Sequence, residues 1–292
     1  MADVAATAPS RSGARRAARA RVLRRIARRP IGIAAAALLL VLTATVAIGP
    51  ELVPHAPSRT NPLNVLQGPS PEHWLGTDEL GRDVFSRILS GGRVSLAVGF
   101  FSMLVGLTLG IGIGGAAGYF GGRVEAVLMR LVDVFMAIPA FFLILVIVTS
   151  FGNHPVTIVV TVGLGFWAQM ARVGHAEFKR FRTHEFVEAS HALGGGHLRV
   201  MTRHILPQVL PQATVLATLG VGWAILTEAA LSYLGLGIQP PLASWGAMLQ
   251  NAQGYLWRQP ILAVWPGLAI AITVLAFNLL GNALRDVLDP RS

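Results

Sequence analysis

Cysteine is absent from the 292 residues, and charged residues make up only 13% of them. Without cysteine the chain has no disulfide framework, no thiolate nucleophile and no Cys-based metal site. A soluble domain would carry roughly 25% charged residues, whereas 53% of this chain is hydrophobic and its mean hydropathy is +0.58. The composition therefore predicts an integral membrane protein and argues against a soluble nucleic-acid-binding domain, despite the net charge of +10.

Lysine is almost as scarce. The one lysine, Lys179, is followed by Arg180, so the sequence cannot form the G-x-x-x-x-G-K-[ST] phosphate loop. An H-E-x-x-H motif is missing as well, and the eight histidines are scattered along the chain. We therefore predict no catalytic residues and no metal ligands.

The start of the chain is strongly basic. Nine arginines fall within residues 1–30, directly before an uncharged run of eighteen residues at 31–48. Such a run is about long enough to cross a bilayer, and arginines beside a span hold that end of the chain inside the cell. A cleaved signal peptide is the rival interpretation, but its apolar core is usually only about 7 to 15 residues long. We expect a cytoplasmic tail at 1–30 and a first transmembrane helix at 31–48.

Five further apolar runs follow a proline-rich segment at 49–92, which we expect outside the membrane. They lie at 96–119, 127–148, 156–171, 213–230 and 261–280. Glycines spaced four apart should line one face of the first of these runs and let another helix approach closely; they are Gly106, Gly110, Gly114 and Gly118. Pro139 should kink the next run. The sequence predicts an all-α polytopic membrane protein with six transmembrane helices and both termini in the cytoplasm.

A polar, basic island interrupts the apolar pattern at 174–210. Glu188, Ala189 and Ser190 are followed by a glycine break that begins at Gly194. After nine more residues comes the sequence HILP, which is His204, Ile205, Leu206 and Pro207. We expect one helix before the glycines and a second short helix that Pro207 limits. The pattern predicts a helix-turn-helix knob on the inner end of the bundle.

Ionisable residues inside the spans are candidates for a translocation path, because a buried charge needs a partner or water. Glu228 has two open interpretations, a role in the path and a structural hydrogen bond. Arg130 and Asp133 lie three apart on one helix face, which favours a pair that satisfies itself over a gating contact.

Two outer segments carry distinctive sequences. Residues 76–87 read GTDELGRDVFSR. We expect their paired charges to order a loop, because no histidine lies at the spacing of a metal site. The sequence from residue 231 reads LSYLGLGIQPPLASWGAML, in which two prolines forbid a continuous helix. The candidates for an extracytoplasmic contact in this segment are Gln239, Pro240, Pro241 and Trp245.

Together these segments resemble the C-type permeases of bacterial dipeptide and oligopeptide ATP-binding-cassette importers. The island resembles their EAA loop, with Ser190 in place of the second alanine and the HILP form of the peptide-transporter branch. The patterns GTD..GRD..SR, R..D...A.P and LSYLGLG.QPP..SWG resemble the same permeases. The resemblance implies a type I importer transmembrane domain with its core at 93–292, in the plasma membrane of a bacterium, whose knob docks on a cytoplasmic ATPase.

By the same resemblance the chain would pair with a second permease and rest on two ATPase domains, which would bind the ATP and Mg²⁺. Dipeptides or oligopeptides would arrive from an extracytoplasmic binding protein, and this chain would hold no cofactor. Nickel, glutathione or haem are alternative cargoes within this branch. The alternative from another class is a secondary transporter driven by an ion gradient, but the sequence shows no convincing inverted repeat.

Overall fold

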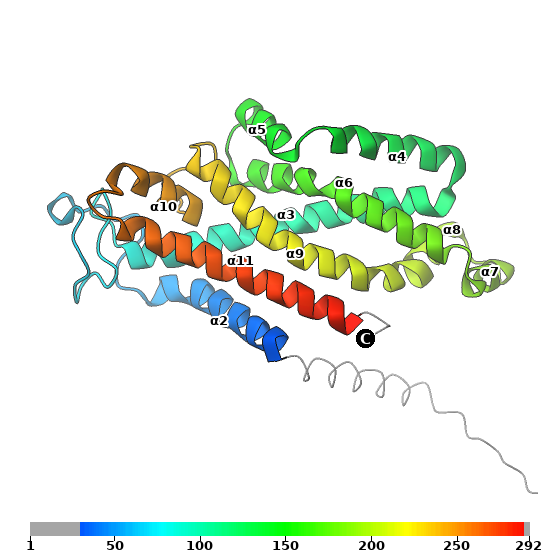
Figure 1. Ribbon diagram of the computed structural model, residues 1–292, viewed down its shortest axis with the longest axis horizontal. Helices are drawn as coiled ribbons and strands as arrows, with labels where there is room; N and C mark the ends of the chain where they lie inside the picture. The colour runs from blue at the N-terminus through cyan, green and yellow to red at the C-terminus, as the bar shows by residue number, and fades with distance from the viewer. Residues whose placement is uncertain (1–29, 289–292) are drawn as a thin grey trace, which may run out of the picture.

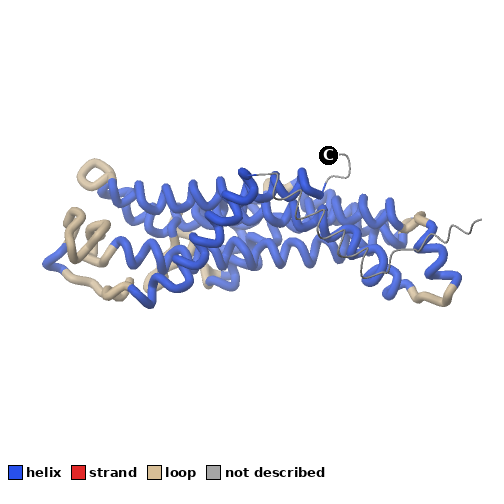
Figure 2. The backbone as a smooth tube through the Cα atoms, turned by 90° about the horizontal axis from the view of Figure 1, so that it is seen from below, coloured by secondary structure: helices blue, strands red, loops and turns tan. Residues whose placement is uncertain are grey.

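The computed structural model describes residues 30–288 (Figures 1 and 2), so nearly all of the tail expected at 1–30 lies outside the described residues. The described part of the chain is almost wholly helical and contains no strand, only an isolated bridge between Thr77 and Asp83. Five of its helices are long and apolar enough to cross a membrane, and one bent pair makes a sixth candidate span. The predicted all-α membrane bundle is confirmed.

The longer helices are α2 (Pro30–Leu52), α3 (Val84–Phe120), α4 (Gly122–Ala137), α5 (Ala140–Phe151), α6 (Pro155–Phe181), α9 (Leu206–Tyr233) and α11 (Ile261–Leu288). The shorter ones are α7 (Glu185–Ala192), α8 (His197–Val200) and α10 (Trp245–Ala252), with 3-10 turns at Pro62–Asn64 and Gln253–Tyr255. At one end of the elongated bundle lie α7 and α8, and we call this the knob end (Figure 1). The segment 53–83 and α10 lie at the opposite end, which we call the far end.

Close packing between α3 and α6 forms the centre of the bundle. Each glycine of the predicted stripe faces α6, and a methyl group on Gly110, Gly114 or Gly118 would overlap its backbone. Such contacts require the two helix axes to approach more closely than side chains allow. The predicted packing role of the stripe is confirmed.

The second span begins earlier than expected. Its helix, α3, starts at Val84 because the Asp83 carboxylate caps it, accepting the N–H of Ser86 at 2.7 Å. Only the part of the GTDELGRDVFSR sequence up to Asp83 is a loop; the rest is helix, buried at Val84, Ser86 and Arg87.

The third span is broken and not merely kinked. Helices α4 and α5 meet at an angle of 86° across Ile138 and Pro139. Proline has no N–H to donate and forces the residue before it into extended backbone, as observed at Ile138. The sequence located this break but underestimated its size.

Pro207 does not limit the helix after the glycines, contrary to expectation. The chain continues from α8 through a π-helical turn at Met201–Ile205 directly into α9. The wider turn, in which the N–H of Leu206 donates to the carbonyl of Met201, makes room for a proline in the first turn of α9. One helical unit, His197–Tyr233, therefore runs from the knob to the far end.

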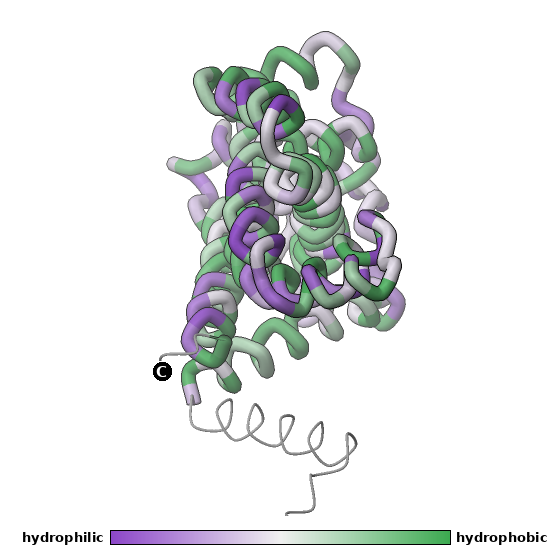
Figure 3. Tube along the Cα trace, turned by 90° about the vertical axis from the view of Figure 1, so that its right-hand side faces the viewer, coloured by the Kyte–Doolittle hydropathy of each residue, from purple (hydrophilic) through white to green (hydrophobic). Residues whose placement is uncertain are grey.

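The surface differs between the ends and the middle of the bundle. Hydrophilic residues occur among the turns of the knob end, onto which Figure 3 looks. Between the ends, large apolar side chains such as Phe100, Phe101 and Val127 are exposed. An exposed apolar belt is what a surface in contact with lipid requires.

The helix contact makes a stability prediction. Gly114→Ala should destabilise the bundle by about 1 to 3 kcal/mol, because the new methyl group overlaps the backbone of Ala171. Gly112→Ala, on the same helix but with no atom within 4 Å of the added carbon, is the matched control. Thermal unfolding in detergent should show a lower midpoint for the first variant only; equal midpoints would contradict the packing role.

Candidate functional site

The knob, residues 185–200, is a helix-turn-helix as predicted. Helix α7 ends in a turn that two backbone hydrogen bonds close. The N–H of Gly194 donates to the carbonyl of His191, and the N–H of Gly195 donates to the carbonyl of Ser190, both at 2.9 Å. Gly194 has a φ of +78°, a backbone conformation that side chains other than glycine's rarely permit. The glycine break thus reverses the chain between α7 and α8.

The outer surface of the knob offers apolar and acidic groups to solvent. Glu188 and Ala189 are exposed, Leu193 is 88% exposed and Leu198 is 75% exposed. Large apolar side chains beside a small residue form a surface that a partner protein can cover. Ser190 is half-buried, and its carbonyl accepts the N–H of Gly195 in the turn.

The base of the knob is anchored in the bundle. Val187, Val200 and Ile205 are buried in one apolar cluster with Phe178 of α6. Of the HILP residues, His204 and Leu206 are half-buried and Pro207 is exposed. The cluster fixes the knob to α6 and α9.

Tyr119, which sequence reasoning missed, joins the knob to α3. Its hydroxyl lies 3.0 Å from Nε2 of His191 and 2.9 Å from Nδ1 of His197, so one side chain contacts both arms of the knob. His191 also reaches the carbonyl of Gly195 at 3.1 Å. A tyrosine at the end of a long apolar run gave no signal of this contact.

Glu228 is fully buried in α9 towards the far end. Its carboxylate accepts hydrogen bonds from Ser232 at 2.7 Å and from Ser95 of α3 at 3.2 Å. These two hydroxyls in turn accept the backbone N–H groups of Ile238 and Trp245, respectively, at 3.1 and 3.2 Å. Glu228 thus connects α9, α3 and the segment 231–245, a geometry that favours the structural interpretation over the path.

Arg130 and Asp133 do not pair with each other as expected. Asp133 contacts Arg172 of α6 at 2.9 Å, while Arg130 is exposed on α4. Closer to the knob, Glu125 of α4 accepts from Lys179 at 2.6 Å. Because both partners come from α6, these contacts hold α4 to α6. They border an open hollow of about 630 Å³ that is lined by Gly122, Glu125, Ala126, Met129, Asp133, Arg172 and His175.

The contact surface expected at the far end is smaller than predicted. Gln239, Pro240 and Pro241 are exposed, but Trp245 is only 2% exposed and its indole N–H donates to the carbonyl of Ile88 at 2.9 Å. Trp245 therefore packs α10 onto α3 and cannot present its ring to a partner.

The outer charges form two separate groups. Asp78 pairs with Arg82 at 2.7 Å and Arg87 at 3.2 Å, which orders the loop as expected. Asp83 instead contacts Nδ1 of His73 at 3.0 Å, and the ring of His55 lies beside His73. The spacing of these residues gave no sign of this contact, because the loop brings together residues that are distant in sequence.

The structure is a bundle of long apolar helices with a helical knob at one end, and comparison with known proteins identifies the class of protein to which it belongs. Residues 106–292 match the family described as binding-protein-dependent transport system inner membrane component, and the chain belongs to this family of ABC importer permeases. Membership in a binding-protein-dependent family removes the alternative of a secondary transporter driven by an ion gradient.

Several curated permeases are similar over most of their length. Nickel transport system permease protein NikC of Escherichia coli (strain K12) is 43% identical, over 87% of this chain and 92% of NikC. Glutathione transport system permease protein GsiD of Pectobacterium atrosepticum is 40% identical, over 92% and 89% of the two chains. Dipeptide transport system permease protein DppC of Alkalihalophilus pseudofirmus is 39% identical, over 87% and 84%.

A solved structure of the MetNI methionine ABC transporter in inward facing conformations has the same fold. It superposes with a TM-score of 0.56 at 18% sequence identity, covering 70% of this chain and 97% of that chain. The fold is therefore that of a type I importer transmembrane domain, as predicted.

Removing the Tyr119 hydroxyl should loosen the knob without unfolding the bundle. Tyr119→Phe loses contacts with two histidines, each worth about 0.5 to 1.5 kcal/mol. Hydrogen–deuterium exchange should rise in residues 185–200, while Tyr233→Phe, at an exposed tyrosine near the far end, should leave exchange there unchanged. Unchanged exchange in the first variant would show that the hydroxyl does not hold the knob.

The two interpretations of Glu228 can be separated by a pair of variants. Glu228→Leu leaves two buried hydroxyls without their acceptor and should cost about 1 to 3 kcal/mol of stability. Glu228→Gln keeps an acceptor and should retain both thermal stability in detergent and uptake. A well-folded Gln variant that has lost uptake would contradict the structural role.

Proposed function

We propose that this chain is the permease half of an ATP-driven importer and that the knob receives the movement of a cytoplasmic ATPase. One observation carries the proposal. The knob exposes Glu188, Ala189 and Leu193 on its outer surface, while its base is anchored in the buried cluster with Phe178. A partner that grips the outer surface can move the helices behind it without unfolding the knob.

The proposed orientation places the knob and both termini in the cytoplasm. The arginines of residues 1–30 and the basic island at 174–210 then lie on the same side of the membrane, as the positive-inside rule requires. Exposed Arg199 and Arg203 would speed encounter with an acidic partner surface. The far end, with Gln239, Pro240 and Pro241, would face the extracytoplasmic binding protein.

The chain would contribute half of the translocation path and no catalytic residue. A second permease would complete the path, and two ATPase domains would bind ATP and Mg²⁺ and hydrolyse the nucleotide. The lack of a phosphate-loop lysine in the sequence supports this division of labour. The open hollow between α4 and α6 is a candidate part of the path, with Asp133 at its edge.

Short peptides, dipeptides or oligopeptides, are the proposed cargo. The HILP form of the knob sequence and the similarity to DppC support this choice, and GsiD is named for the transport of glutathione, itself a small peptide. Nickel is the second candidate. The 43% identity with NikC and the group of His55, His73 and Asp83 at the far end favour it.

A charge in the knob should uncouple transport. Gly194→Asp adds a carboxylate at a position with no atom within 4 Å of the added carbon, and the strain that its φ of +78° imposes is confined to the turn of the knob, so the bundle should still insert and fold. Burying that charge without a partner under an ATPase costs at least about 2 kcal/mol, which weakens docking more than about tenfold. Co-purification of the ATPase subunits and ATP-dependent uptake should both fall by at least that factor.

The matched control is Gly152→Asp, which adds the same charge at an exposed, open glycine with a similar φ of +84°, between α5 and α6. That variant should retain ATPase binding and uptake. Normal uptake by Gly194→Asp, with wild-type amounts of protein in the membrane, would refute the proposed coupling. Identification of the co-purified subunits by mass spectrometry tests the partners, and uptake of labelled dipeptide against labelled nickel tests the cargo.

A further inference from the structure

Three side chains that are far apart in sequence meet at the far end. His55 follows the end of α2, His73 lies in the outer loop and Asp83 caps α3. One potential ligand atom from each lies within 4.8 Å of the other two. The centroids of the two imidazole rings are 4.7 Å apart, and His73 Nδ1 is 3.0 Å from Asp83 Oδ1. Two imidazole nitrogens and a carboxylate oxygen thus converge on a single small volume.

The surroundings hold these side chains in place. The backbone around His73 is fixed by hydrogen bonds between its N–H and the hydroxyl of Ser70 and between its carbonyl and the N–H of Gly76. Asp83 is fixed by its role as helix cap, which occupies Oδ2 through the N–H of Ser86. A carboxylate has about four lone-pair positions, so the cap leaves capacity for a further ligand.

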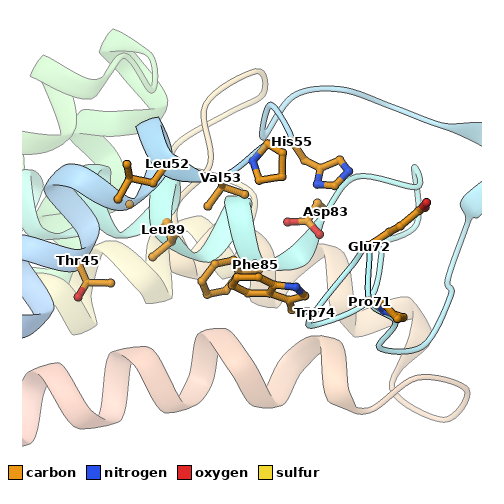
Figure 4. Close-up of a pocket in the computed structure, with 12 residues that line it drawn as sticks. Thr45, Leu52, Val53, His55, Pro71, Glu72, Trp74, Asp83, Phe85 and Leu89 are labelled. Carbon is orange, nitrogen blue, oxygen red and sulfur yellow. The ribbon is translucent and has the colours of Figure 1, made fainter.

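Solvent reaches the group from two sides. A largely apolar hollow of about 540 Å³ and a polar one of about 350 Å³ are both lined by His55, Glu72 and Asp83. In Figure 4 the ring of His55 lies above the carboxylate of Asp83. Exposed Glu72 lies at the border of both hollows, where it can supply a further oxygen ligand. An ion can therefore enter without the bundle opening.

The donor set selects the class of ion. Imidazole nitrogen combined with carboxylate oxygen suits Ni²⁺, Zn²⁺ and related transition metals, whereas Mg²⁺ and Ca²⁺ prefer oxygen ligands alone. Soft Cu⁺ favours thiolate or thioether sulfur, and the chain has no cysteine. We propose that His55, His73 and Asp83 form a binding site for one divalent transition-metal ion at the far end of the bundle.

A bound ion would add a further link to the contacts that already hold the far end together, such as the pair of Arg93 with Glu51. The ion links the end of α2 to the start of α3 through the outer loop, so occupancy would restrain the loop at the far end. The proposal concerns this site and does not depend on the cargo or on coupling through the knob. Failure of either earlier proposal therefore leaves the metal site standing. Failure of the metal site would remove one of the two observations that favour nickel, and would leave the peptide cargo and the coupling through the knob untouched.

The test measures metal bound to the full-length chain, purified in detergent with its partner subunits through an affinity tag that contains no histidine. After treatment with chelator and its removal, the complex is dialysed against Ni²⁺ or Zn²⁺ and the metal is counted by mass spectrometry. Titration then gives the affinity. The part of the tryptophan fluorescence change that a Trp74→Phe variant loses gives a local readout, because Trp74 lines the same hollow. We expect about one high-affinity ion per permease and no displacement by excess Mg²⁺.

Two variants and one control assign the ion to these residues. His55→Ala removes a half-buried ligand, and Asp83→Asn weakens a ligand while keeping a good helix cap. Each should lower the affinity at least about tenfold. His154→Ala, at an exposed histidine before α6, should leave it unchanged. The proposal is overturned if the wild type binds no ion, if both folded variants bind as the wild type does, or if the control loses as much.

Discussion

The backbone contact between α3 and α6 is the constraint on which the rest of the bundle depends. Gly110, Gly114 and Gly118 allow α6 to lie directly against α3, and the other helices pack around this pair. Because α6 ends close to the knob and α3 begins at the far end, the contact connects the two ends of the bundle. In a membrane, lipid supplies no hydrophobic driving force between helices. Helix association depends instead on close van der Waals packing, which small residues permit.

Polar groups then fasten each end to this central pair in a different way. At the knob end, Tyr119 of α3 reaches both arms of the knob, and Lys179 of α6 holds Glu125 of α4. At the far end, the buried carboxylate of Glu228 accepts hydrogen bonds from the hydroxyls of Ser95 in α3 and Ser232 in α9. Buried polar groups are costly unless they are fully bonded, so the contacts of Tyr119 and Glu228 specify one arrangement of the helices.

The sequence was informative for most features that a single helix or turn determines, although it wrongly ended a helix at Pro207. It located the spans, the glycine face of α3, the turn at Gly194 and the break at Pro139. It failed where the partner lies in another element: Asp133 bonds to Arg172, Trp245 is buried against Ile88, and His55 reaches the group at Asp83. Periodicity describes neighbours within one helix and carries no information about residues that folding brings together.

The uninterrupted helical unit from His197 to Tyr233 has a mechanical consequence. Its 37 residues amount to a rod of about 55 Å, and the knob forms one end of it. A tilt of only about 5° about the knob end would displace the opposite end of such a rod by about 5 Å. Had Pro207 ended the helix, that displacement would be lost in a hinge. The π-helical turn at Met201–Ile205 lets the chain carry a proline there and keeps the helical unit continuous.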